Sequence, residues 1–124
     1  MFSLINFGLE FYENLFQKPY PFQKYDQAFV PNLDYLGMEV CSLTLLTGNY
    51  VVSDRQSTKD KKSQRSLTVL HELSHMYFGN CATMKWWDDI WLNESFAVFI
   101  CHEALNHYID QRRRQAKQQS LQQG

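Results

Sequence analysis

Residues 71–94 read HELSHMYFGNCATMKWWDDIWLNE, and they carry the strongest signal for both fold and chemistry. His71 and His75 are four residues apart, so on a helix their imidazoles project from one face, one turn above the other. Both rings can then reach a single ion at the roughly 2.0–2.1 Å of a zinc–nitrogen bond. A catalytic zinc needs a third protein ligand and an open position. Glu94, separated from His75 by 18 residues, is the candidate, and we predict one Zn²⁺ per chain.

Glu72 lies next to the first histidine and points to the flank of the same helix face. From there a carboxylate can reach a water at the metal without being a ligand, which predicts a general base. The alternative is that the two histidines are satisfied polar residues of a core helix. A glutamate at the expected downstream position favours the metal site over that alternative.

The residues around the histidines predict a helix. Ser63 or Ser66 can cap its start, and Gly79-Asn80 is a typical C-terminal stop. An apolar stripe lies beside the histidine face: Leu67, Leu70, Leu73 and Tyr77.

A second helix is predicted from about residue 91 to 109, with Glu94 in its first turn facing the histidines. Its side chains are apolar nearly all round, so we expect it to be buried: Phe96, Val98, Phe99, Ile100, Ala104 and Leu105. Trp86, Trp87 and Trp91 are expected to pack around the two helices rather than to line a cleft.

The whole stretch HELSHMYFGN…WLNESFA resembles the zinc-binding segment of the aminopeptidase N family of gluzincins, whose pattern is close to HELAHQWFGN…WLNEGFA. Upstream, Leu36-Gly37-Met38-Glu39-Val40 resembles the family's Gly-Ala-Met-Glu-Asn motif. The similarity covers roughly residues 9–108. It implies an α+β fold, namely a helix-dominated fragment of a thermolysin-like catalytic domain with a small edge-strand region.

The resemblance also implies functional roles for individual residues. Glu39 would bind the free N-terminal ammonium of a peptide substrate, with Gly37 and Met38 beside it, and Glu72 would be the catalytic base. Residues 1–110 would form the partial catalytic domain. Residues 111–124, which are Gln- and Arg-rich, are predicted to be a frayed helix end or a disordered tail.

Several positions depart from the family pattern. Leu36 and Val40 replace Gly and Asn, and a valine cannot make the hydrogen bonds of an amide side chain. Val98 stands where a thermolysin-type Asp would support a zinc histidine, so that support must come from another group. The family's catalytic tyrosine lies farther downstream than the 30 residues that follow Glu94, and Tyr108 is a poor substitute.

Composition is that of a globular piece, with 44% hydrophobic residues and a net charge of −1. A net charge this close to zero does not indicate binding to nucleic acid. No apolar run reaches the length of a membrane span. Met1 to Leu9 has no basic n-region or clear cleavage site, which favours a cytoplasmic location; the oligomeric state stays open. The three cysteines are expected to be buried free thiols.

The remaining segments are predicted more coarsely. Residues 9–17 have helical spacing, and residues 39–46 are apolar and indicate a strand, which the resemblance to the aminopeptidase N family places at the border of the cleft. Residues 53–66 are predicted to be a polar loop leading into the first zinc helix.

Three functions remain open. The first is a zinc aminopeptidase of which this chain is the catalytic core. The second is a thermolysin-like endopeptidase, which a changed residue at Val40 favours. The third is a truncated, non-catalytic zinc- or peptide-binding protein, which the missing tyrosine favours.

Overall fold

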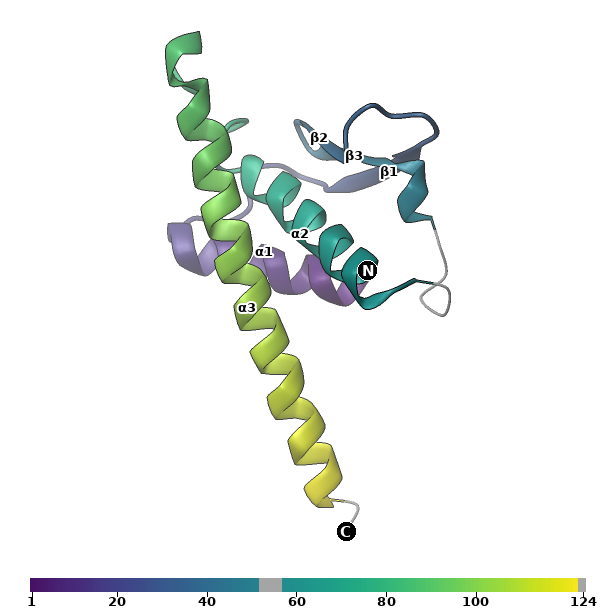
Figure 1. Cartoon of the computed structure of the whole chain (residues 1–124). Coiled ribbons are helices and arrows are strands. Elements are labelled where there is room, and N and C mark those ends of the chain that lie inside the picture. Colours follow the sequence, from purple (N-terminus) through teal and green to yellow (C-terminus); the bar gives the residue numbers. More distant parts are fainter. Residues whose placement is uncertain (52–56, 123–124) are drawn as a thin grey trace.

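The computed structural model describes residues 1–51 and 57–122, and this part of the chain is built mainly from helices around one small sheet (Figure 1). The α-helices are α1 (Phe2–Phe16), α2 (Lys59–His75) and α3 (Ile90–Gln122). Two short 3-10 helices, η1 (Gly48–Tyr50) and η2 (Trp87–Asp89), follow the sheet and precede α3. The predicted α+β class, dominated by helices with a small strand region, is confirmed.

The sheet has three strands, β1 (Asp26–Val30), β2 (Gly37–Val40) and β3 (Leu43–Thr47), in the order β1-β3-β2. β1 runs parallel to β3, whereas β2 pairs with β3 in an antiparallel hairpin. The prediction of one strand over residues 39–46 is wrong, because a two-residue loop at Cys41-Ser42 divides it. Ser42 has a φ of 62°, which is the positive φ that tight hairpin loops require.

α2 lies between the sheet and α3, so it presents one face to each of them (Figure 1). It begins at Lys59, because Thr58 accepts a hydrogen bond from the backbone N–H of Lys61 and caps the helix. The expected caps Ser63 and Ser66 are therefore wrong. The expected polar loop over 53–66 is helical from residue 59 onward, and residues 52–56 lie outside the described residues.

The core lies where α1, α2, α3 and β3 meet. Its fully buried side chains come from all of these elements or from the turn after α2: Tyr12, Leu46, Val69, Leu70, Leu73, Met76 and Ala104. Burying one leucine of this kind contributes roughly 1.5–3 kcal/mol. The Tyr12 hydroxyl donates a 2.9 Å hydrogen bond to the Leu70 carbonyl, which links α1 to the helix that carries the histidines.

α1 begins at Phe2, seven residues before the predicted start at Leu9. Leu4 and Ile5 are buried against the core, so the apolar N-terminal residues extend the helix by packing. Nothing in the described residues is a helix apolar and long enough to cross a bilayer. All three cysteines are free thiols, but Cys41 and Cys81 are exposed and only Cys101 is buried.

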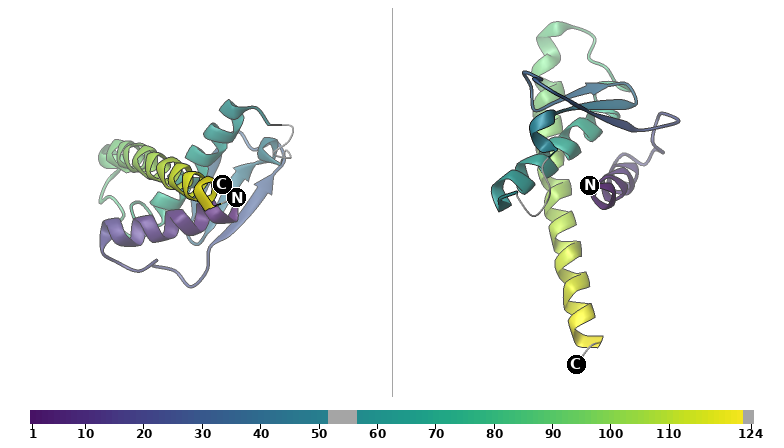
Figure 2. Two further views of the ribbon diagram at one scale, coloured as in Figure 1. Left: turned by 90° about the horizontal axis from the view of Figure 1, so that it is seen from below. Right: turned by 90° about the vertical axis from the view of Figure 1, so that its right-hand side faces the viewer.

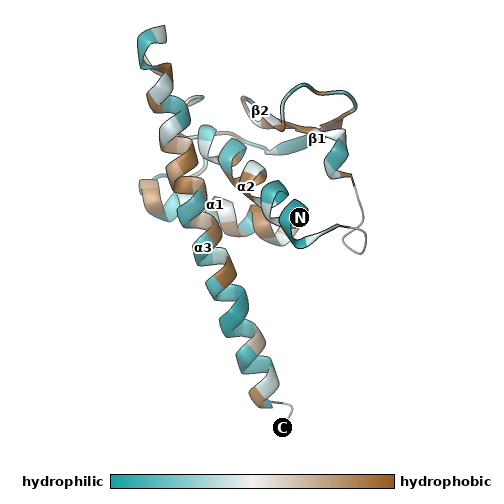
Figure 3. Ribbon diagram, in the orientation of Figure 1, coloured by the Kyte–Doolittle hydropathy of each residue, from teal (hydrophilic) through white to brown (hydrophobic). Residues whose placement is uncertain are grey.

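α3 is longer and more exposed than predicted. It continues past residue 109 to Gln122, and its C-terminal part extends away from the body of the molecule (Figure 2). Figure 3 shows that this part is mostly hydrophilic, and residues 111–122 are all exposed. Its Gln, Arg, Lys and Ala residues are good helix formers, so nothing in the sequence ends the helix earlier. The domain division at residue 110 stays a prediction.

The expectation that α3 is buried on all sides is also wrong. Only one stripe of the helix packs against α1 and α2, and it contains Ala97, Ile100 and Ala104. Val98 and Phe99 point away from this stripe and are 47% and 61% exposed.

Candidate metal centre and active site

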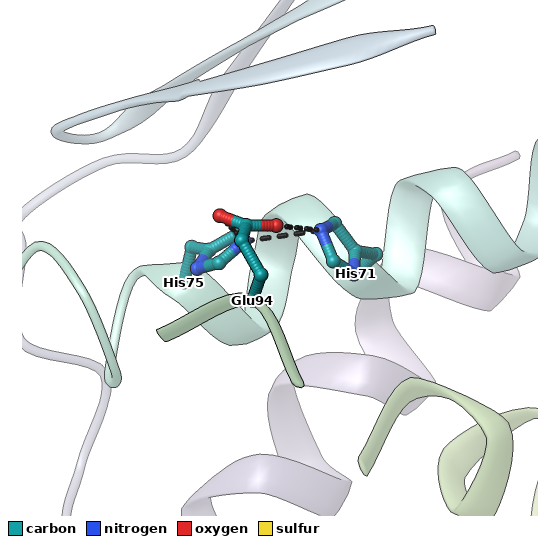
Figure 4. A group of neighbouring side chains, drawn as sticks. All are labelled: His71, His75 and Glu94. Carbon is teal, nitrogen blue, oxygen red and sulfur yellow. Dashed lines mark hydrogen bonds and ion pairs between the residues drawn. The ribbon is translucent and has the colours of Figure 1, made fainter. Parts of the chain in front are cut away.

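The predicted metal ligands converge at the crossing of α2 and α3 (Figure 4). His71 and His75 project from the last turns of α2, and Glu94 projects from the start of α3 towards them. The two histidine Nε2 atoms lie 3.1 Å apart. The Glu94 carboxylate oxygens lie 3.3 Å from Nε2 of His71 and 3.5 Å from Nε2 of His75.

These separations fit a zinc ion. Three ligand atoms on a tetrahedral zinc at 2.0–2.1 Å lie about 3.3–3.4 Å from one another. Two imidazoles and one carboxylate are also a ligand set that catalytic zinc uses. His75 is fully buried, whereas the Glu94 side chain is about half exposed, so the site is anchored in the core and reaches the surface on the Glu94 side.

The second nitrogen of His75 is held by the backbone. Its Nδ1 lies 3.1 Å from the carbonyl oxygen of Phe78, a geometry in which Nδ1 carries the proton and donates it. Nε2 then keeps its lone pair for a metal. The Phe78 carbonyl thus supplies a hydrogen bond that orients a histidine, which the apolar side chain of Val98 cannot do.

The turn after α2 brings that carbonyl into place. Gly79 has a φ of 130°, a conformation that residues with a Cβ rarely adopt. A Cβ at this position would lie 2.7 Å from Oδ1 of Asn93 and 3.2 Å from Nδ1 of His75. The backbone N–H of Asn80 then donates to the carbonyl of His75 at 2.8 Å and closes the end of the helix.

Asn93 positions Glu94, the predicted third ligand. It is buried, and its Nδ2 donates a 3.2 Å hydrogen bond to Oε1 of Glu94. Its Oδ1 is buried and has no hydrogen-bond partner among the described residues. Sequence reasoning missed Asn93, although its place directly before the ligand Glu94 was a signal that could have found it.

Glu72 is a buried carboxylate beside the histidines, with 5% of its surface exposed. Burial, followed by repulsion from the carboxylates of Glu39 and Glu94, raises its pKa to about 8. A Cβ on residue 37 would lie only 2.4 Å from Oε1 of Glu72, so Gly37 leaves room for this carboxylate against β2. A carboxyl group with a raised pKa is suited to accept and return a proton near neutral pH.

Burial, followed by the electrostatic effect of the neighbouring His75 imidazole, lowers the pKa of His71. A lowered pKa favours the neutral imidazole, which is the form that binds a metal.

The three predicted substrate-binding residues lie on β2, an edge strand. Gly37 and Glu39 share the face directed at α2, since strand residues two apart point the same way. Ligand atoms of Glu39, Glu72 and His75 lie within 4.8 Å of one another. Strand alternation places Met38 on the opposite face, so its side chain does not share the surface of Glu39.

The ligand atoms of a second group are also close enough together to hold an ion: Glu39, Glu72 and His75. The set shares His75 with the first group, so the two sets describe one location rather than two independent sites. The set with two imidazoles is the better zinc site, because imidazole suits zinc better than an additional carboxylate.

Tyr108 lies away from this centre. Its ring packs 5.2 Å from that of Phe7 in α1, and its hydroxyl lies 3.1 Å from Ser3 Oγ. It is 14 residues from Glu94 on one helix, a rise of about 21 Å, so it cannot reach the metal ligands.

The expectation that the tryptophans pack around the helices is wrong. Trp86, Trp87 and Trp91 are 67%, 76% and 64% exposed, and the first two line a pocket that also contains Glu39.

A buried helix with two histidines and a base, crossed by a helix with a third ligand, is the arrangement of a zinc peptidase centre. The Peptidase family M1 domain matches residues 4–123 of this chain. The chain therefore belongs to peptidase family M1, the family of the aminopeptidase N proteins, and is a partial domain of that family.

Similar proteins support the same assignment. Aminopeptidase N of Streptomyces lividans is 40% identical over 99 residues, which is 80% of this chain and 11% of the relative. Leucyl aminopeptidase of Saccharolobus solfataricus is 40% identical over 80% of this chain and 13% of its own length. Endoplasmic reticulum aminopeptidase 1 of Homo sapiens is 44% identical over 74% of this chain and 10% of its own length. The chain thus spans only about a tenth of the length of these relatives.

Proposed function

We propose that this chain is the catalytic core of a zinc-dependent aminopeptidase, which hydrolyses the N-terminal peptide bond of peptides. The observation that carries the proposal is the convergence of three ligand atoms at 3.1–3.5 Å with the buried carboxylate of Glu72 beside them. When bound, zinc supplies Lewis-acid chemistry that polarises a carbonyl and acidifies a water.

Glu72 performs the proton transfers in this proposal. Its carboxylate accepts a proton from the attacking water and later delivers it to the amine that leaves. Its burial and its carboxylate neighbours raise its pKa to about 8 in the metal-free chain, and the charge of a bound zinc would lower it towards the carboxylate form that accepts the proton.

Glu39 selects substrates with a free N-terminus. Its carboxylate forms a charge-assisted contact with an α-ammonium, which an internal peptide cannot offer. Because β2 is an edge strand, the backbone groups of Gly37, which point away from β3, can pair with the extended substrate. Gly37 would then contribute main-chain rather than side-chain contacts, whereas the backbone of Met38 pairs with Leu45 of β3.

The non-catalytic binding protein remains the second candidate, and the position of Tyr108 favours it. If oxyanion stabilisation by a tyrosine is needed, Tyr108 cannot provide it from its place against α1. If the rate of hydrolysis did not depend on a free N-terminus in the substrate, a thermolysin-like endopeptidase would be indicated instead.

The test is hydrolysis of leucine p-nitroanilide and its N-acetylated form by the zinc-loaded chain, compared with Glu72→Gln. We expect cleavage of the free compound only, and a 10²–10⁴-fold loss in the variant with zinc retained, because an amide cannot accept the water's proton. Zinc binding without any cleavage would select the non-catalytic candidate. Equal cleavage of both compounds would select the endopeptidase.

A further inference from the structure

α3 has a second side, away from the stripe that packs against α1 and α2. Residues at intervals of seven follow this side, the spacing that keeps side chains at the seam of a helix pair: Leu92, Phe99, Asn106 and Arg113. Phe99 is 61% exposed, and Asn106 and Arg113 are exposed too. This side therefore offers apolar surface in its first half and a cation in its second half.

The charges along η2 and α3 are segregated. Residues 86–111 contain five Asp and Glu residues and neither Lys nor Arg, whereas residues 112–122 contain four Lys and Arg residues and no acid. The helix dipole does not account for this order, because its effect is confined to the terminal turns, and α3 has no acid in its first turn and no base in its last. Such a helix is complementary to a second copy of itself, provided that the copy runs antiparallel.

The cationic end of α3 extends away from the body of its own molecule (Figure 1). Residues 111–122 are all exposed. Among the described residues, Arg113 is the one base of this end that forms an ion pair, and its partner is Asp110 of the same helix at 3.4 Å. A helical segment of about twelve residues without tertiary contacts is marginal in water, so a neighbour along this end would stabilise it.

We propose that two copies of this chain associate through α3, with the two helices antiparallel. The cationic end of one copy, at Arg113 and Lys117, then lies against the acidic start of the other, at Asp88 and Asp89. Phe99 lies near the two-fold axis in this register, where the second helix covers it. A parallel pair would instead place like charges side by side.

The size of this contact sets the strength of the association. The paired stretch, from residue 88 to residue 117, is about 45 Å long, and one helix is about 10 Å wide. Such a contact buries on the order of 900 Å² in total, which is the size of weak, reversible interfaces. The dimer therefore forms in a concentration-dependent equilibrium.

Sedimentation equilibrium of the full chain, from micromolar to sub-millimolar concentration, measures this equilibrium. A reducing agent is present because Cys41 and Cys81 are exposed thiols. We expect monomer and dimer, with a dimer fraction that falls as NaCl is raised from about 0.05 to 0.5 M, because salt screens exposed charges.

Two charge-reversed variants test the antiparallel register. The first combines Arg113→Glu with Lys117→Glu, and the second combines Asp88→Lys with Asp89→Lys. Each should weaken its own dimerisation about tenfold or more, since like charges then face each other. An equimolar mixture should form a heterodimer about as tightly as the unchanged chain dimerises, because both contacts again join opposite charges.

The control combines Lys59→Glu with Lys61→Glu at exposed positions of α2. It changes the net charge as the first variant does and should dimerise as the unchanged chain does. A chain that stays monomeric throughout the concentration range would overturn the proposal, and would leave this side of α3 to a different protein segment. The proposal also fails if the two variants dimerise unchanged, if their mixture does not regain the dimer, or if the control loses it equally.

Discussion

At the scale of single residues, the candidate metal centre depends on side chains that are themselves held in place by neighbouring groups. His75 is fixed by burial and by the Phe78 carbonyl at 3.1 Å, and Glu94 is held by Asn93 at 3.2 Å. Such outer hydrogen bonds orient ligands and tune their affinity for a metal. Two of the three predicted ligands thus depend on groups outside the HELSH sequence.

We expect Asn93→Ala to weaken zinc binding by about 10–100-fold, because the half-exposed carboxylate of Glu94 loses its orienting donor. Competition with a chromophoric chelator gives the affinity. Asn106→Ala, at an exposed position of the same helix, is the control and should bind zinc as the unchanged chain does. An unaltered affinity in Asn93→Ala would show that the hydrogen bond does not position the ligand.

Glu72 should make the stability of the metal-free chain depend on pH. Its pKa of about 8 in the folded state exceeds the ordinary value of 4.5, so the folded chain holds a proton that the unfolded chain has released. The resulting stabilisation is fully present below about pH 4.5 and is lost as the pH rises through about 8. Since one pKa unit corresponds to about 1.4 kcal/mol, the loss should amount to a few kcal/mol.

Urea unfolding in the presence of a chelator measures this effect. Between pH 5.5 and 8.5, the unchanged chain should lose more free energy of unfolding than Glu72→Gln, which has no proton to release. Glu103→Gln, at an exposed site, should behave as the unchanged chain does. Parallel pH curves for the unchanged chain and Glu72→Gln would contradict the raised pKa.

At the scale of elements, the turn after α2 connects the fold to the site. Gly79 lets the chain reverse directly behind His75, and this reversal places both the Phe78 carbonyl and the Asn93 side chain near that histidine. The turn therefore sets the relation between the ends of α2 and α3.

Gly79→Ala should destabilise the chain by about 1–3 kcal/mol, because a Cβ at this φ is strained and would approach Asn93 to 2.7 Å. The free energy of unfolding from urea titration measures it. Gly48→Ala is the matched glycine variant, since its Cβ would meet no atom closer than 3.3 Å, and its loss should be smaller. Equal losses would mean that Gly79 has no special role.

The elements also show how far the sequence alone could lead. The helical spacing of His71 and His75, and the facing position of Glu94, follow from the geometry of one turn and were predictable. The pairing of β1 with β3 was not, because residues 26–30 and 43–47 meet only through tertiary contacts. The division of residues 39–46 was missed because Cys41-Ser42 is not a typical turn sequence.

At the scale of the whole molecule, the helices are covered unevenly by their neighbours. α2 is covered by the sheet on one side and by α1 and α3 on the other, whereas η2 and the first half of α3 expose large apolar side chains. Hydrophobic pattern alone predicted burial for Phe99 and the tryptophans, because it registers apolar residues but not which neighbours cover them. The convergence of His71, His75 and Glu94 was easier to predict than the surface around them.

The central claim is that His71, His75 and Glu94 bind one zinc ion, and zinc content after dialysis tests it most directly. We predict about one equivalent per chain for the unchanged protein and for His102→Ala, which alters an exposed histidine of α3. We predict close to none for His75→Ala. Because His75 is buried, Glu94→Gln provides a second test at a half-exposed position and should also lose most of the metal. One equivalent of zinc in both His75→Ala and Glu94→Gln would contradict the account.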